Sequence, residues 1–211
     1  MGLHFHPTNI LPGNLHEAVF KKDPSKAKYQ QIFQLYPDLD EYATGDLFEP
    51  HPSKPGFWKP VGRKEEAITL ESTAYIKQIF PPLLENAVLE HYSDIISDLQ
   101  IGGHGLQQPY ALIKYKPIST EDIRTWMLKK ECLDYMDRLC AQWWRSSIKA
   151  HIQLDEGESL ERTYKGTLAR SRNEERFGGE IERGAGGRKK FEGNSEDRKE
   201  FERLGEVRIS Y

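Results

Sequence analysis

The sequence predicts an α+β fold with a β-rich first part and a mixed second part. Three observations support this class. The first 60 residues are rich in Pro, Gly and aromatic side chains and contain only short apolar runs. Apolar residues at helical spacing begin at Pro82, and a longer stripe of the same kind runs from Ile123 to Trp143. The pattern of the sequence changes after Arg63, from short apolar runs to segments with strand and helix periodicity. This change predicts a domain boundary there, with one domain over residues 1–62 and a second over 63–183.

The composition is that of one medium or two small domains. Of the 211 residues, 37% are hydrophobic and 30% are charged. The formal net charge of -3 provides no basic field for nucleic-acid phosphates or an anionic lipid surface. No apolar stretch approaches the ~18 residues that cross a bilayer, and the N-terminus shows no apolar leader. We therefore expect a cytoplasmic protein with no nucleic acid and no membrane among its partners.

Short strands joined by turns are expected in the first part. Strands are predicted at Glu17–Phe20 and Gly56–Trp58, with a loop bounded by Pro50, Pro52 and Pro55 between them. His4 and His6 alternate near the N-terminus, but two histidines without a third ligand do not predict a metal site.

The second part should contain a hairpin and a helix before its longest element. Ala67–Leu70 predicts a strand, and Pro82–His91 predicts a helix because its apolar residues recur at helical spacing after a proline. Two strands, Ile95–Ile101 and Tyr110–Tyr115, flank the loop Gly102–Gly105, whose glycines suit a hairpin turn.

A long helix should follow, capped by Ser119–Asp122 and running toward Ser146. Its expected apolar stripe consists of Ile123, Trp126, Met127, Leu133, Met136, Leu139, Cys140 and Trp143. Cys132 and Cys140 match neither a zinc cluster nor a disulfide framework, so we expect two half-buried apolar residues. His151–Leu154 predicts a strand and Asn173–Arg183 a charged helix. Residues 184–211 have too few apolar groups to bury, which predicts a disordered charged tail.

Three segments, in order, resemble elements of the adenylate-forming enzymes, the superfamily of acyl-CoA synthetases, nonribosomal peptide synthetase adenylation domains and luciferases. Tyr42–Pro52 contains Tyr-Ala-Thr-Gly-Asp and is similar to the ribose-contact element. Gly56–Glu66 is similar to the hinge segment, which is normally Gly-Arg-x-Asp, and Arg162–Arg170 is similar to the C-terminal lysine loop. The similarity covers roughly residues 14–183 and is strongest to the fungal synthetase-like and reductase-like subgroup of secondary metabolism.

The resemblance implies an architecture and a reaction. Residues 1–62 would be the C-terminal edge of the large adenylation domain, and residues 63–183 a small C-terminal α/β lid domain with a three-stranded sheet and flanking helices. Such enzymes use ATP with Mg²⁺ to join a carboxylic acid to AMP, and then pass the acyl group to the thiol of CoA or phosphopantetheine.

The resemblance also implies roles for four residues. Asp46 would bind the ribose, Arg63 would lie near the ribose or phosphate, Glu65 would be the hinge, and Lys165 would be the catalytic lysine. Two departures stand out: Glu65 replaces the usual Asp, and the lysine precedes Gly166 instead of following it.

Three of these roles have a structural alternative. Asp46 could close its own turn, Arg63 could be a surface residue beside Glu65 and Glu66, and Lys165 could be a solvated loop lysine. For the whole chain, the leading expectation is a truncated adenylate-forming ligase, inactive alone, whose partners would be the missing adenylation core or a carrier or reductase domain. The alternative is a noncatalytic interaction module derived from an adenylation domain. A small enzyme of another family is weaker, because no nucleophile–base arrangement is visible.

Overall fold

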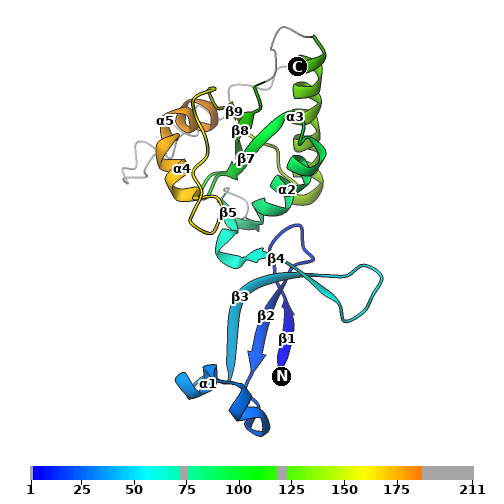
Figure 1. Cartoon of the computed structure of the whole chain (residues 1–211), viewed down its shortest axis with the longest axis vertical. Helices are drawn as coiled ribbons and strands as arrows, with labels where there is room; N and C mark the ends of the chain where they lie inside the picture. Colours follow the sequence, from blue (N-terminus) through cyan, green and yellow to red (C-terminus); the bar gives the residue numbers. More distant parts are fainter. Residues whose placement is uncertain (1, 72–75, 118–122, 187–211) are drawn as a thin grey trace, which may run out of the picture.

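The computed structural model describes residues 2–71, 76–117 and 123–186, which form an α+β fold with three β-sheets (Figure 1). The expected fold class is confirmed. The first sheet, coloured blue to cyan, occupies the lower half of Figure 1, and the later sheets and helices occupy the upper half. Among the helices in these ranges, none is long and apolar enough to cross a membrane.

Four antiparallel strands in sequence order make the first sheet. They are β1 (Leu3–Pro7), β2 (His16–Lys21), β3 (Glu41–Pro50) and β4 (Trp58–Arg63). The predicted strand Glu17–Phe20 lies within β2. The strand predicted at Gly56–Trp58 begins only at Trp58, because the preceding residues form the turn that reverses the chain. The β2–β3 connection holds two short helices that the sequence did not predict, η1 (Pro24–Tyr29) and α1 (Ile32–Leu35).

The second part contains a two-stranded ribbon and a three-stranded sheet covered by helices on both faces. Its elements are the turn η2 (Lys64–Glu66), β5 (Ile68–Glu71), β6 (Ile76–Ile79), α2 (Pro81–His91), β7 (Ile96–Gly102), β8 (Tyr110–Tyr115), α3 (Ile123–Trp144) and β9 (His151–Gln153). β7 pairs with β8 antiparallel, and β8 pairs with β9 parallel. The strands, hairpin and helices predicted between residues 67 and 154 are confirmed, within a few residues at their ends.

Successive residues of β8 serve two cores, as a strand with both faces buried requires. Ala111 and Ile113 face α2 and α3, whereas Tyr110 and Leu112 face the helices at the C-terminal end of the described chain. Figure 1 shows α2 and α3 on one side of the sheet, and α4 (Arg170–Arg176) and α5 (Gly178–Ile181) on the other.

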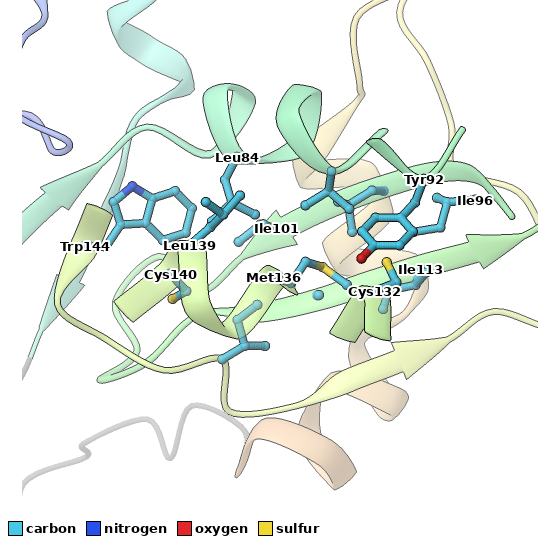
Figure 2. Packing of buried hydrophobic residues seen from close by; sticks show 14 of the residues in the cluster. Leu84, Tyr92, Ile96, Ile101, Ile113, Cys132, Met136, Leu139, Cys140 and Trp144 are labelled. Carbon is cyan, nitrogen blue, oxygen red and sulfur yellow. The ribbon is translucent and has the colours of Figure 1, made fainter. Parts of the chain in front are cut away.

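The buried face of α3 is offset from the predicted stripe. Figure 2 shows Cys132, Met136, Cys140 and Trp144 packed among α2, α3 and the sheet, and all four are buried. The two cysteines are therefore fully buried rather than half-buried. Trp126 and Met127, expected in the stripe, are instead 63% and 58% exposed. The predicted cap Ser119–Asp122 lies outside the described residues.

The predicted helix Asn173–Arg183 is wrong as a single charged helix. The chain forms α4 (Arg170–Arg176), α5 (Gly178–Ile181) and a π-helical turn η3 (Glu182–Gly186). Phe177 and Ile181 are buried against β8, which explains why a charged sequence folds here. Residues 184–186, expected in the tail, belong to η3. The remainder of that predicted tail, 187–211, lies outside the described residues.

The two parts meet through an extended segment and a small apolar cluster. Leu11, between β1 and β2, pairs with Ile79 at the end of β6. The Leu11 N–H donates to Gln78 O at 2.9 Å, and the Leu11 carbonyl accepts the Phe80 N–H at 3.1 Å. Phe80 is buried in one cluster with Ile10, Leu15 and Leu47.

Candidate functional site

Asp46 and Arg63 face each other across the first sheet. They are register partners on β3 and β4, and Arg63 Nη1 donates to Asp46 Oδ1 at 2.6 Å. Arg63 Nε also donates to Glu65 Oε1 at 3.4 Å. Hydrogen bonds to Asp46 and then Glu65 raise the pKa of Arg63, so its charge is permanent. The two side chains are 45% and 47% exposed, so this charged pair remains accessible to a ligand.

A hydroxyl turn orients the backbone just before Asp46. Thr44 Oγ1 donates to the Ala18 carbonyl at 3.0 Å and accepts the Asp46 N–H at 3.0 Å. The Gly45 N–H donates to Glu17 Oε1 at 3.2 Å. Thr44 rather than the Asp46 carboxylate therefore closes this turn, and the Asp46 side chain is directed to Arg63.

A second ion pair lies next to this site. It joins Lys64, the residue after Arg63, to Glu17, whose other carboxylate oxygen accepts the Gly45 N–H. Lys64 Nζ lies 2.7 Å from Glu17 Oε2, and the Glu17 side chain is largely buried. This pair borders a cavity of about 410 Å³ whose lining also includes His6 and Glu41. Sequence reasoning gave no role to Glu17, although its place on a predicted strand otherwise made of apolar residues was a usable signal.

The predicted hinge residue, Glu65, lies in the turn η2 between β4 and β5. Its side chain is exposed. The turn is closed by Glu66, whose Oε2 accepts the Arg63 N–H at 2.9 Å. Arg63 and Glu65 are thus held in one short turn that links the two parts of the chain.

Lys165 lies at the tip of a small hairpin. Arg162 and Leu168 form a bridge, and the Thr163 N–H donates to Thr167 O at 2.8 Å. Gly166 turns the tip with φ +83°, a backbone conformation that favours glycine. The Lys165 side chain is exposed, with Nζ 5.6 Å from the ring centroid of the adjacent Tyr164.

The segment that carries Lys165, residues 155–169, is drawn in yellow in Figure 1. Arg170, directly after this segment, interacts electrostatically with Glu66 of η2, the hinge turn. The structure therefore brings Asp46, Arg63 and Glu65 into one group, whereas Lys165 lies on a separate hairpin whose C-terminal end, at Arg170, interacts with the hinge turn.

Sequence reasoning missed a buried ion pair behind the lysine loop, between Glu85 of α2 and Arg170 of α4. A signal was available. Positions 81, 84, 85 and 88 lie on one helical face, so an acid at 85 within an apolar face predicts a buried partner.

The described residues offer no ligand set for a metal ion, since they contain no suitable group of three or more His, Cys, Asp or Glu side chains. His4 and His6 lie side by side on β1, with ring centroids 6.5 Å apart. The Mg²⁺ implied by the resemblance thus has no preformed ligand set among these residues.

No protein-family model matches the sequence. Three fungal adenylate-forming reductases match parts of it. Nps10 of Heterobasidion annosum is 59% identical over 34 residues, 16% of this chain and 3% of the relative. Nps11 and Nps9 of Serpula lacrymans are 44% identical over 52 residues and 31% identical over 87 residues. These two alignments cover 25% and 41% of this chain, but only 4% and 8% of the relatives. The chain therefore spans less than a tenth of the curated relatives it matches.

Solved structures share the fold at low sequence identity. The adenylation domain of a carboxylate reductase from Mycobacterium chelonae matches with a TM-score of 0.54 and 14% identity, over 86% of this chain and 31% of that one. An anthranilate CoA ligase in complex with anthranoyl-AMP matches with a TM-score of 0.51 and 15% identity, over 83% of this chain and 33% of that one. A Mycobacterium tuberculosis fatty acyl CoA synthetase gives 0.50 and 14%, over 85% of this chain and 34% of that one.

The sequence matches give the relationship, and the structural matches give the fold. Parts of the sequence are similar to fungal adenylate-forming reductases, and the chain shares its fold with the C-terminal region of adenylation domains and acyl-CoA ligases of known structure.

Proposed function

We propose that this chain supplies the ribose-binding, hinge and lysine elements of an AMP-forming ligase that activates a carboxylic acid with ATP and passes it to a thiol. The observation that supports this role is the exposed Asp46–Arg63 pair directly before the hinge turn. The chain spans about a third of the solved structures that share its fold, so the remaining elements of the site would come from the other two thirds.

Asp46 would bind the nucleotide through its ribose. A carboxylate can accept hydrogen bonds from both vicinal hydroxyls, and these charge-assisted bonds are stronger than neutral ones. Arg63 already binds Oδ1 of Asp46, which would keep the carboxylate oriented for the ribose hydroxyls. The remaining guanidinium donors of Arg63 would then point to the ribose or the α-phosphate.

Lys165 would act in the chemical step. A carboxylate oxygen of the acid attacks the α-phosphorus of ATP, a new O–P bond forms, and the bond to pyrophosphate breaks. Negative charge on the phosphate oxygens increases in the transition state, and a positioned ammonium stabilises it. In the second step the thiol sulfur bonds to the acyl carbon and AMP leaves.

Glu65 would be the pivot between these two steps. A single backbone position can absorb a hinge rotation, and Glu65 lies in the turn between the two proposed domains, 1–62 and 63–183. Because the pivot uses the backbone, Glu at this position would serve as well as Asp.

Complementation in trans tests this proposal. The chain is mixed with the adenylation core of a fungal adenylate-forming reductase from which the corresponding C-terminal region has been removed. Carboxylate-dependent ATP–pyrophosphate exchange is then measured. We expect no exchange from either component alone and restored exchange from the mixture. Lys165→Ala should lower the restored kcat by roughly 10²–10³-fold, whereas Asp46→Ala should mainly raise the KM for ATP.

The control is Lys149→Ala, which removes another exposed lysine of the same part and should leave exchange unchanged. A folded mixture that shows no exchange, or restored exchange that is insensitive to Lys165→Ala, would refute the catalytic role.

A noncatalytic interaction module is the second candidate, favoured by the exposed Trp126 and Met127 on α3. In that case Trp126→Ala with Met127→Ala should weaken binding of the chain to the adenylation core at least tenfold, measured by calorimetry, while no exchange appears. Unchanged affinity would rule this surface out.

A further inference from the structure

We propose that Arg170 and Glu85 are positioning residues for Lys165: together they fix the root of the lysine hairpin to α2 and β7, so that the tip is presented in a set place. This inference rests on the role proposed for Lys165.

The C-terminal root of the hairpin is held by a bidentate ion pair. Arg170 Nη1 and Nη2 donate to Glu85 Oε1 and Oε2 at 2.7 and 2.6 Å. The Glu85 side chain is 5% exposed and that of Arg170 is 16% exposed. Glu85 Oε1 also accepts the Ile101 N–H at 2.7 Å, and Arg170 Nη1 donates to the Ile101 carbonyl at 3.3 Å. One pair therefore joins α2, β7 and the start of α4.

Such a pair is better suited to fixing geometry than to adding stability. Removing two charges from water is costly, and well-packed apolar side chains of similar size stabilise a core as well or better. Burial lowers the pKa of Arg170, but the charge and hydrogen bonds of Glu85, together with the charges of Glu66 and Glu174, more than offset this and raise the pKa overall, so the guanidinium stays charged. The planar guanidinium donates two parallel hydrogen bonds to the two carboxylate oxygens, and this geometry fixes the position of Arg170 relative to α2.

The N-terminal root is held by Asn173, which is fully buried on α4. Its Oδ1 accepts the Glu161 N–H at 2.7 Å, and its Nδ2 donates to the Glu161 carbonyl at 3.1 Å. Nδ2 also donates to Oε1 of the buried Gln100 at 2.8 Å, and Gln100 Nε2 donates to the Arg170 carbonyl at 3.3 Å. Both ends of segment 161–170 are therefore tied to β7 through one buried network.

Arg162 connects the tip of the hairpin to β7. Its Nη2 lies 2.6 Å from Asp98 Oδ1 on β7, and its Nη1 donates to the Gly166 carbonyl at 2.8 Å. The Thr163 and Thr167 hydroxyls are hydrogen-bonded across the hairpin at 2.8 Å. The backbone of Lys165 is thus ordered before any ligand arrives, and only its side chain must be oriented on binding.

The test compares hydrogen exchange of hairpin amides with that of the sheet. In the double variant Glu85→Gln/Arg170→Met both charges are removed, but the glutamine oxygen can still accept the Ile101 N–H. We expect exchange at Thr163, Gly166 and Ala169, whose N–H groups are hydrogen-bonded within the hairpin, to accelerate by about tenfold or more, with β7 and β8 amides unchanged. Arg170→Lys keeps the positive charge but cannot donate two parallel hydrogen bonds to the carboxylate, so it should accelerate hairpin exchange to an intermediate extent.

Two control variants distinguish a loss of order in the hairpin from a general loss of stability in the second part. Arg172→Met removes an exposed ion pair to Glu161 from the same helix and should leave the hairpin unchanged. Met136→Ala perturbs the core between α2 and α3 and should accelerate sheet and hairpin together. Unchanged hairpin exchange in the double variant, or acceleration shared equally by β7 and β8, would overturn the proposal.

The complemented enzyme gives the second readout. The double variant should lower kcat by roughly 10²-fold while the KM for ATP stays constant, because Asp46 is not touched. A rise in the KM for ATP at constant kcat would also overturn the positioning role. Because hydrogen exchange needs no catalysis, a complementation that fails in the wild type counts against the proposed function alone.

Discussion

Gly62 is the residue on which the packing around the hinge turn depends most directly. Its φ is +153°, and a Cβ atom at this position would lie 2.7 Å from Glu66 Oε2 and 2.8 Å from the Phe80 ring. Phe80 is fully buried and cannot move aside. Gly62→Ala should therefore lower the free energy of unfolding by about 1–3 kcal/mol, measured by urea denaturation. Gly56→Ala, with φ +83° but open space around it, provides the backbone-only comparison. Equal losses in the two variants would contradict the steric argument.

At the same scale, the sequence predicted some site residues better than others. Asp46 and Arg63 were expected near one ribose only through their motifs, and their direct pairing depends on the β3–β4 register, which no local pattern shows. Glu85 and Arg170 lie 85 positions apart, so their contact follows from the tertiary fold alone. The apolar face around Glu85 could have predicted that a partner exists, but not which one.

At the scale of elements, the buried cysteines of α3 make the stability of the folded state depend on pH. Burial raises the pKa of Cys132 and Cys140 from 9.0 to about 12. The folded state therefore keeps these protons at a pH where the unfolded chain loses them. This contribution to stability is complete below pH 9 and is lost as the pH rises toward 12, by about 1.4 kcal/mol per pH unit for each thiol.

Urea denaturation at several pH values between 8 and 10.5 measures this loss. Cys132→Ala/Cys140→Ala should make the decline with pH shallower, whatever its effect on stability at pH 8. The wild type and the double variant have the same surface lysines. The difference between their slopes therefore reports the effect of the two thiols alone. Identical slopes in the wild type and the double variant would refute burial as the cause.

Elements with strong periodicity were predicted well, and those set by packing were not. Pro82–His91 and the two strands around Gly102–Gly105 repeat apolar residues at a clear spacing, and they were confirmed. Trp126 and Met127 fit the α3 stripe by spacing but lie on its exposed side. Phe177 illustrates the opposite case: together with Ile181 it anchors an otherwise charged segment, and two apolar side chains are too few to reveal a period.

At the scale of the whole molecule, the two parts are held together unequally. The second part has a large core shared by two helices and two sheets. The corresponding cluster of the first part is small: its buried members Ile10, Leu15 and Leu47, with the partly buried Val61, are completed by Phe80 from the second part. A rotation at Glu65 that carried β6 away would have to break the Leu11 hydrogen bonds and withdraw Phe80. The first sheet should therefore lose stability whenever this contact opens.

Phe80→Ala tests that dependence. Removing a buried Phe side chain typically costs about 3–5 kcal/mol, and here the loss should fall on the first sheet. Peptide-level hydrogen exchange should show faster opening of β2 and β3, with β7 and β8 unchanged. Met136→Ala, in the core of the second part, should give the reverse distribution. If Phe80→Ala instead opens all strands equally, the chain is one cooperative unit. The boundary proposed between residues 62 and 63 would then not separate independently opening domains, because opening at Phe80 would propagate through both cores.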